Sequence, residues 1–255
     1  MSDLQRLDQL LLAQGLARSR AQGQKLIAAG LVSVCIAGRW QVVTKVSAKF
    51  ADDTACTVAQ GEENQYVSRA GLKLAGALQR SGLNVSGLHA LDVGQSTGGF
   101  TDCLLQHGVA HVVGVDVGHG QLDTRLQDHP QVTSLEKCNA RELSAELLMA
   151  SAGISQFSLV VMDVSFISQS LIWPRLAPLL APGGHVVSLV KPQFEVGAEG
   201  VGKGGLVKDA SLYLSLEQRL RKEVVSLGLH VVDFFDSPIR GGDGNREFFL
   251  IAGSD

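Results

Sequence analysis

The 255-residue sequence lacks the long apolar stretch, roughly 18 residues, that a membrane-spanning helix needs. Its longest candidate, residues 26–38, is interrupted by glycine and serine. The first residues, MSDLQRLDQ, are polar and lack the basic start and apolar centre of a signal peptide. We therefore expect neither a membrane span nor secretion by that route, and we expect the protein to be cytoplasmic.

Cysteine is scarce, and no two cysteines form a C-x-x-C pair. That spacing excludes the common zinc and redox motifs, so we expect no metal site. Dispersed cysteines in a chain of this length are typical of reduced thiols in the cytoplasm. The four cysteines are Cys35, Cys56, Cys103 and Cys138.

Charged residues are also few, at 18 %, whereas hydrophobic residues make up 45 % of the chain. This balance excludes a chain that is disordered throughout. A sequence of 255 residues can bury a substantial core, and it has room for one large domain or two smaller ones.

Positive charge is concentrated near the start of the sequence. Residues 1–50 contain seven Lys and Arg residues against two acidic residues, a balance of +5. Because the whole chain carries −3, the remaining residues carry −8. A basic segment on an acidic body suggests a polyanion-binding module joined to a second domain.

Residues 1–60 have the pattern of a small α+β domain. Leucines at positions 4, 7, 10 and 11 follow helical spacing, and Ser19 can cap a second helix over residues 20–29. Residues 31–36 and 40–46 then have the pattern of a β-hairpin. Because residues 61–64 are polar, we predict a domain boundary between residues 60 and 61.

From Tyr66 onward, short apolar runs alternate with helical patterns. A predicted helix over residues 69–81 comes first. The predicted strands are residues 89–93, 112–116, 132–135, 157–163, 185–191, 230–235 and 247–251. The predicted helices between them are residues 100–107, 121–127, 141–150, 168–180 and 210–227. This alternation predicts an α/β domain over residues 61–255, with a mostly parallel sheet covered on both faces.

The segment LDVGQSTGGFTD, residues 91–102, has the pattern of a strand, a glycine turn and a helix start. Gly94 permits a sharp turn, and Gly98 and Gly99 let the backbone approach a ligand closely. Asp116 ends the next strand, where a carboxylate can bind two ribose hydroxyls. The pattern is not the G-x-G-x-x-G dinucleotide fingerprint. It is typical of S-adenosylmethionine binding in class I methyltransferases; the alternative is an ordinary strand-to-helix turn.

Two charged side chains follow the fourth and fifth strands of this domain. Asp163 and Phe166 partly match the D/N-P-P-aromatic motif of amine methyltransferases, but the prolines are missing, which disfavours amine methylation. Asp163 could alternatively cap the next helix. Lys191 ends an apolar strand, where a lysine is costly unless it is paired or functional. Its alternative is a side chain whose ammonium simply reaches water.

Residues 197–204 match the pattern G-x-x-x-x-G-K of phosphate-binding loops. Gly204, however, stands where such a loop needs Ser or Thr to bind magnesium. The segment also follows the fifth strand rather than opening the domain. We interpret it as a mobile substrate loop in which Lys203 contacts phosphate.

Several motifs in combination resemble the TlyA family, haemolysin-named proteins that act as ribosomal RNA 2′-O-methyltransferases. They are YVSRAGLKL (66–74), the glycine segment, VDVGHGQL (115–122), DVSFIS (163–168) and VKPQFE (190–195). The first domain resembles the S4 RNA-binding domain, and the second is similar to the FtsJ (RrmJ) type of class I, Rossmann-like methyltransferase with a seven-stranded sheet. The resemblance covers essentially the whole chain.

The resemblance implies S-adenosylmethionine as the cofactor, ribosomal RNA or a ribosomal subunit as the partner, and Lys191 as the proton acceptor. The implied catalytic tetrad is Lys73, Asp163, Lys191 and Glu247. The implied cofactor-binding residues are Asp92, Gly94, Ser96, Thr97, Gly98, Gly99, Phe100, Asp116, Asn139 and Asp163. The implied RNA-binding residues are Arg6, Arg18, Arg20, Lys25, Arg39 and Lys203. Since Glu247 begins the last strand, that strand should run antiparallel to reach the same edge.

One residue departs from the family pattern, because Asn139 stands where many relatives have an acid that holds adenine. Three alternative functions remain open. The first is a membrane-active haemolysin, against which the missing span and signal pattern count. The second is an RNA-binding protein without catalysis, against which the intact tetrad counts. The third is cytosine C5 methylation, which needs a nucleophilic thiol; Cys103 lacks the usual proline neighbour and fits a core position better.

Overall fold

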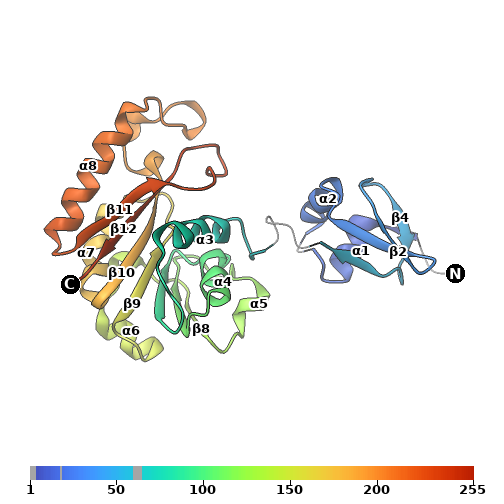
Figure 1. Ribbon diagram of the computed structural model, residues 1–255, viewed down its shortest axis with the longest axis horizontal. Helices are drawn as coiled ribbons and strands as arrows, with labels where there is room; N and C mark the ends of the chain where they lie inside the picture. The colour runs from blue at the N-terminus through green and yellow to red at the C-terminus, as the bar shows by residue number, and fades with distance from the viewer. Residues whose placement is uncertain (1–3, 18, 60–64) are drawn as a thin grey trace. The chain divides into compact units, whose positions relative to one another are not determined.

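The computed structural model describes residues 4–17, 19–59 and 65–255 (Figure 1). The chain forms two compact units, Met1–Gln65 and Tyr66–Asp255. The predicted boundary between residues 60 and 61 lies outside the described residues, and it stays a prediction. In the described part of the chain, no helix is both long and apolar enough to cross a membrane.

The first unit is a small α+β fold. Its strands are β1 (Leu4–Arg6), β2 (Val32–Ile36), β3 (Arg39–Val42), β4 (Lys49–Ala51) and β5 (Cys56–Val58), and its helices are α1 (Leu7–Ala13) and α2 (Arg20–Ala28). Ser19 caps α2 as predicted, since its Oγ accepts a hydrogen bond from the backbone N–H of Gln22 at 3.2 Å. Leu7, Leu10, Leu26 and Ile27 are buried between the helices and β2.

Two predictions for this unit are wrong in detail. Leu4 does not belong to a helix, because residues 4–6 form β1, which pairs antiparallel with β4. The second hairpin strand begins at Arg39, one residue earlier than predicted, and it ends at Val42, four residues earlier than predicted. In both places the conformation is set by strand pairing, of β1 with β4 and of β2 with β3. The spacing of apolar residues along the sequence does not show such pairing.

The second unit contains a seven-stranded sheet in the order β11-β12-β10-β9-β6-β7-β8. Its strands are β6 (His89–Val93), β7 (His111–Val115), β8 (Val132–Leu135), β9 (Phe157–Met162), β10 (Leu180–Val190), β11 (His230–Asp236) and β12 (Phe248–Gly253). β12 runs antiparallel to both of its neighbours, and the β10-β9-β6-β7-β8 pairs are parallel. The predicted mostly parallel sheet and the antiparallel last strand are therefore confirmed.

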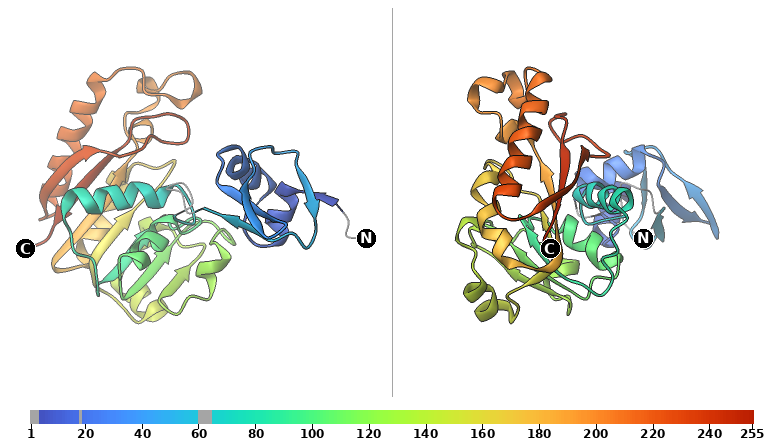
Figure 2. Two further views of the ribbon diagram at one scale, coloured as in Figure 1. Left: turned by 45° about the vertical axis from the view of Figure 1, so that its right-hand side comes forward. Right: turned by 60° about the vertical axis from the view of Figure 1, so that its left-hand side comes forward.

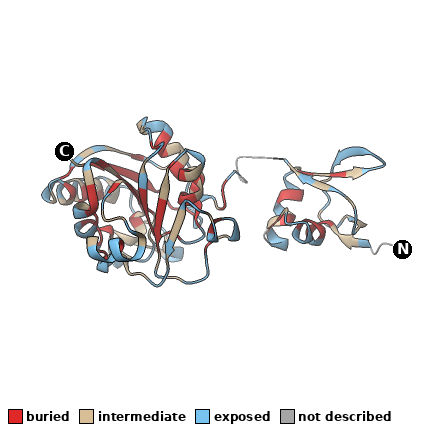
Figure 3. Ribbon diagram, turned by 90° about the horizontal axis from the view of Figure 1, so that it is seen from below, coloured by how far each residue is buried: buried red, intermediate tan, exposed pale blue. Residues whose placement is uncertain are grey.

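Helices cover both faces of this sheet (Figure 2). They are α3 (Ala70–Ser81), α4 (Gly99–Gln106), α5 (Thr124–Gln127), α6 (Ala145–Ala152), α7 (Trp173–Leu176) and α8 (Ser211–Ser226). Buried residues of α3 and α4 share one hydrophobic cluster, and those of α6, α7 and α8 share another. Figure 3 shows the strands between these layers as largely buried.

The predicted helix over residues 168–180 is wrong as a continuous helix. The segment instead forms a 3₁₀ turn (Gln169–Leu171), the short α7 and a second 3₁₀ turn (Ala177–Leu179). Pro174 and Pro178 lack the N–H that a helix interior needs, so they occur at the starts of new turns. The predicted helix over residues 121–127 is likewise shorter, because α5 begins at Thr124 after Asp123 caps it.

Candidate active site

Three loops of the second unit meet at the carboxyl edge of the sheet, because β9, β6 and β7 lie side by side and run parallel. Gly94, Asp116 and Asp163 are the residues that follow these strands. The Gly94 N–H bonds to the Val115 carbonyl, and the Asp163 N–H bonds to the Val93 carbonyl, both at 2.9 Å. The carboxyl edge between parallel strands is where open α/β sheets bind ligands.

Gly94 is needed where the chain turns out of β6. Its φ is +84°, and a Cβ atom there would lie 2.5 Å from the carbonyl oxygen of Asp163. Any other residue would have to push the end of β9 away. The close approach of these two backbones therefore depends on glycine.

The carboxylate of Asp116 is held by the backbone on both oxygens. Oδ2 accepts from the Ser96 N–H at 2.8 Å, and Oδ1 accepts from the Gly118 N–H at 2.6 Å. Each carboxylate oxygen can accept a second hydrogen bond. Asp116 is thus fixed in place while it keeps acceptor capacity for a ligand.

A cavity of about 360 Å³ opens between the β6, β7 and β9 loops. Its walls combine apolar side chains with the Asp116 and Asp163 carboxylates. The lining residues are Gly94, Ser96, Val115, Asp116, Val117, Gln121, Cys138, Asn139, Ala140, Asp163, Val164, Ser165, Phe166, Ile167 and Ile172. We refer to it as the larger cavity.

A smaller cavity of about 130 Å³ adjoins the larger one, and both are lined by Gly94, Ser96, Asp163 and Ser165. It lies against the start of α4 and reaches the end of β10. Its other lining residues are Ser68, Ala70, Gln95, Thr97, Gly99, Phe100 and Lys191.

Lys191 and Asp163 form an ion pair on the wall of the smaller cavity. The Nζ atom of Lys191 lies 2.6 Å from Oδ1 of Asp163, and both side chains are largely buried. Nζ also donates a hydrogen bond to Ser165 Oγ at 2.9 Å. The ammonium is therefore held at the cavity rather than extended into solvent, contrary to the alternative considered for it.

A second ion pair joins Lys73 of α3 to Glu247, which immediately precedes β12. Lys73 Nζ donates to Glu247 Oε2 at 2.6 Å, and the two residues are 9 % and 4 % exposed. Burial raises the pKa of Glu247, while the hydrogen bond from Lys73 and the charge of Lys191 oppose that rise. The two ion pairs are thus close enough to act on each other electrostatically.

Two residues of the predicted cofactor set, Asp92 and Gly98, line neither cavity. Asp92 is fully buried, lines neither cavity and accepts a 2.6 Å hydrogen bond from Thr101 Oγ1. Burial raises the pKa of Asp92 to about 7. Gly98 also lines neither cavity and instead packs under Leu126. Asn139 lines the larger cavity, but its Oδ1 also accepts from the Arg141 N–H.

The predicted RNA-binding residues are spread over both units. Arg6 and Arg20 both donate to the buried carboxylate of Asp8. The hydrogen bond from Arg6 is the main reason that the pKa of Asp8 is lowered to about 2. Lys25 and Arg39 are exposed on the first unit, and Lys203 is exposed on the second. Arg18 lies outside the described residues.

The polar cavity residues that the sequence did not predict include Ser68, Gln95, Gln121 and Ser165. Ser165 bonds to Lys191, and Gln121 Oε1 accepts from Ser96 Oγ at 3.4 Å. The signal was present, because each lies inside one of the motifs quoted above. Small polar residues in such motifs carry little information by themselves, and only the folded loops show which ones face a cavity.

The mostly parallel seven-stranded sheet, the antiparallel last strand and the cavity at the carboxyl edge define a class I methyltransferase fold. The chain belongs to the FtsJ-like methyltransferase family, whose family model matches residues 66–254. A second family model, the S4 domain, matches residues 5–34. The predicted fold class is therefore confirmed for both parts of the chain.

Relatives extend over nearly the whole sequence. The chain is 43 % identical to the "16S/23S rRNA (cytidine-2'-O)-methyltransferase TlyA" of Mycobacterium tuberculosis, over 96 % of this chain and 88 % of the relative. It is 37 % identical to "Hemolysin A" of Brachyspira hyodysenteriae, over 95 % and 97 %. A solved structure of a hemolysin-named protein from Streptococcus thermophilus has 39 % identity and a TM-score of 0.73, covering 100 % of this chain and 90 % of that chain. The predicted resemblance to the TlyA family is confirmed.

We predict that replacing Gly94 with alanine destabilises the second unit more than replacing Gly87, another glycine with positive φ. A Cβ at Gly87 meets open space, so Gly87→Ala should cost only the strain of about 1–2 kcal/mol. Gly94→Ala should cost about 1–3 kcal/mol more, because its Cβ meets the Asp163 carbonyl. Urea unfolding measures both free energies, and equal costs would contradict the close approach.

Proposed function

We propose that this chain transfers a methyl group from S-adenosylmethionine to a ribose 2′-hydroxyl of ribosomal RNA. The observation that carries the proposal is the Lys191–Asp163 ion pair on the wall of the smaller cavity, with the Lys73–Glu247 pair close by. The relative named as an rRNA (cytidine-2'-O)-methyltransferase supports the same reaction. If rRNA is the substrate, the enzyme acts in the cytoplasm, where ribosomes are found.

The larger cavity fits the adenosine part of the cofactor. Asp116 is preorganised by two backbone N–H groups and retains acceptor capacity for two ribose hydroxyls. Val117, Ile167 and Ile172 provide apolar walls for a purine ring. Asn139 supplies an amide that can hydrogen-bond to the ring edge.

The smaller cavity fits the amino-acid part of the cofactor, because small residues and the start of α4 line it. In our proposal Gly94, Ser96, Thr97, Gly99 and Phe100 hold this part. Asp92 and Gly98 take supporting positions instead. Asp92 fixes Thr101 of α4 from below, and Gly98 allows the loop to pass over a buried leucine.

S-adenosylmethionine, when bound, supplies a methyl group already activated on a sulfonium. The chain must then align the ribose oxygen and take up its proton, since a ribose hydroxyl is a weak nucleophile at neutral pH. Lys191 lines the smaller cavity, and in its neutral amine form Nζ can take up the proton of this oxygen. Asp163 and Ser165 hold Nζ in place from two directions, so its position is defined before substrate arrives.

The remaining tetrad residues, Lys73, Asp163 and Glu247, influence the position of Lys191 and the charge around it. Glu247 neutralises Lys73 and lies within electrostatic range of Lys191. In our proposal this second pair sets the charge around the attacking oxygen, and Asp163 orients Lys191. The S4 domain in the first unit, with Lys25 and Arg39, binds the RNA by its phosphates.

We expect Asp116→Ala to weaken S-adenosylmethionine binding by about 10- to 100-fold, because hydrogen bonds to a charged group are lost. Titration calorimetry on the full chain measures this change directly. Asp128→Ala is the matched control, because Asp128 is an exposed aspartate outside both cavities. Unchanged affinity in Asp116→Ala would move the cofactor site elsewhere.

We expect Lys191→Ala to lower the turnover number by about 100- to 10,000-fold while leaving cofactor affinity intact. Lys191→Arg should fail as well, because a guanidinium does not release its proton near neutral pH. Transfer of labelled methyl groups to ribosomal subunits measures turnover, with Lys222→Ala on the exposed surface of α8 as control. Near-normal turnover of the arginine variant would mean that Lys191 contributes charge alone.

RNA binding should weaken steeply with salt, since basic residues release counterions from phosphates. Replacing Lys25 and Arg39 with glutamine should reduce the slope of log affinity against log salt by about 1 for each residue. Filter binding at several salt concentrations measures the slope, and Lys222→Gln in the second unit is the control. An unaltered slope in the Lys25 and Arg39 variants would assign RNA binding to other residues.

A further inference from the structure

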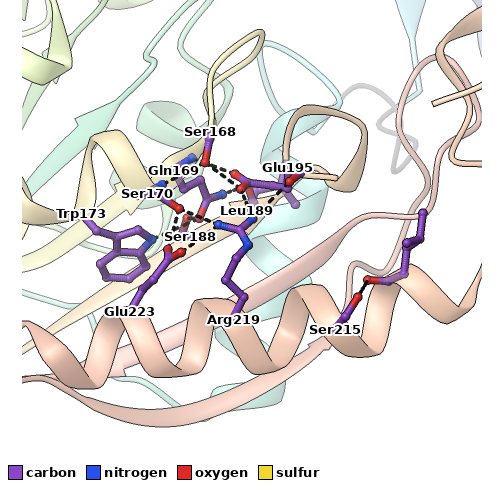
Figure 4. Close-up of polar contacts among 11 residues, drawn as sticks. Ser168, Gln169, Ser170, Trp173, Ser188, Leu189, Glu195, Ser215, Arg219 and Glu223 are labelled. Atoms are coloured by element: carbon purple, nitrogen blue, oxygen red, sulfur yellow. Dashed lines mark hydrogen bonds and ion pairs between the residues drawn. The ribbon is translucent and has the colours of Figure 1, made fainter. Parts of the chain in front are cut away.

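The buried carboxylate of Glu195 connects the two loops that carry Asp163 and Lys191. Figure 4 shows its polar contacts. Glu195 lies four residues beyond Lys191, and its side chain is 1 % exposed. One oxygen accepts from Ser168 Oγ at 2.8 Å, and the other accepts from the Gln169 N–H at 2.7 Å. Ser168 and Gln169 belong to the loop that begins with Asp163. The same carboxylate is thus attached by the chain to one loop and by hydrogen bonds to the other.

Arg219 completes the coordination of Glu195 from α8. Its Nη2 lies 2.7 Å from Glu195 Oε2 and 3.3 Å from the Glu195 carbonyl oxygen. Its Nη1 donates to Ser170 Oγ at 2.8 Å and to Glu223 Oε1 at 2.9 Å. A carboxylate removed from water is tolerated only when such charged and polar partners surround it.

Gln169 adds a second link at the place where the β9–β10 ladder stops. The last paired residues are Ser188 and Met162. Just beyond them, Gln169 Nε2 donates to the Leu189 carbonyl at 2.6 Å, and its Oε1 accepts from Ser188 Oγ at 2.7 Å. A side chain therefore takes over the hydrogen bonding of β10 where the neighbouring strand ends.

We propose that Glu195 is a positioning residue, which fixes Lys191 relative to Asp163 through Ser168, Gln169 and Arg219. We call these four residues the loop clamp: Ser168, Gln169, Glu195 and Arg219. The loop clamp lies outside both cavities, so it acts through the loops and does not contact substrate. The inference rests on the proposed function, because it assigns the clamp to the methyl transfer that Lys191 performs.

Glu195→Gln tests the loop clamp with little change in shape. The amide keeps one acceptor oxygen for three donors, and its NH₂ group faces the donors of Arg219. We expect the turnover number to fall by about 10- to 100-fold, because small misplacements of reacting groups lower the rate by such factors. The KM for S-adenosylmethionine should change less than the turnover number, because no clamp residue lines the cofactor cavities and the clamp reaches the larger cavity through the loop of residues 163–167.

Glu223→Gln is the matched control, because Glu223 is the other carboxylate that Arg219 contacts. It lies on α8 and bonds to Ser170 rather than to the loop of Lys191. We expect turnover within about twofold of the original chain. If Glu195 contributed stability alone, Glu195→Gln would lower the unfolding temperature without changing the turnover of the folded fraction at low temperature.

Hydrogen–deuterium exchange provides a readout that does not depend on activity. Glu195→Gln should speed exchange in residues 163–170 and 191–196 and leave α3 and β6 unchanged, whereas Glu223→Gln should leave residues 191–196 unchanged. Normal turnover of Glu195→Gln, or exchange raised evenly across the second unit, would overturn the clamp. Normal turnover of Lys191→Ala would instead overturn the proposed function, so the two failures are distinguishable.

Discussion

Lys191 and Asp163 can form an ion pair because β9 and β10 run parallel and end at the same edge of the sheet. Neighbouring strands lie about 5 Å apart, so residues that follow them come within contact range. Glu247 reaches this edge by the opposite route, since it stands at the start of an antiparallel strand. Strand direction alone therefore gathers side chains from three distant parts of the chain.

Gathering these charges has an energetic cost that the pairing offsets. Lys73 and Glu247 are almost completely removed from water, and each would be strongly unfavourable there without the other. The same holds for Glu195 under its shell of donors. Consequently, substitutions in the site affect stability and activity together, and controls that retain a charge partner are needed to separate them.

The alternation of apolar runs and helices predicts the parallel sheet, because continuous apolar strands must be covered on both faces. It does not predict that Lys73 contacts Glu247, which lies 174 positions further along the chain. The family resemblance implies that both belong to one tetrad, and the structure shows that they pair with each other. The loop clamp carries little sequence signal. Ser168 and Glu195 end two of the quoted motifs, but Ser, Glu and Arg are common residues, and Arg219 lies far away in the sequence on another element. The predicted helix over residues 168–180 is wrong because the apolar residues have helical spacing, but Pro174 and Pro178 interrupt the helix.

Net charge does not show which basic side chains of the first unit already have an acidic partner within the fold. Arg6, Arg20 and Gln24 all donate to one buried carboxylate, Asp8, so two of the basic side chains already have an acidic partner within the fold. An arginine held in this way loses freedom and presents its remaining N–H groups in a fixed direction. Lys25 and Arg39 are instead exposed and free to follow a phosphate backbone. The residues that bond to Asp8 and the residues that we propose to contact phosphate are therefore different members of the basic set in this unit.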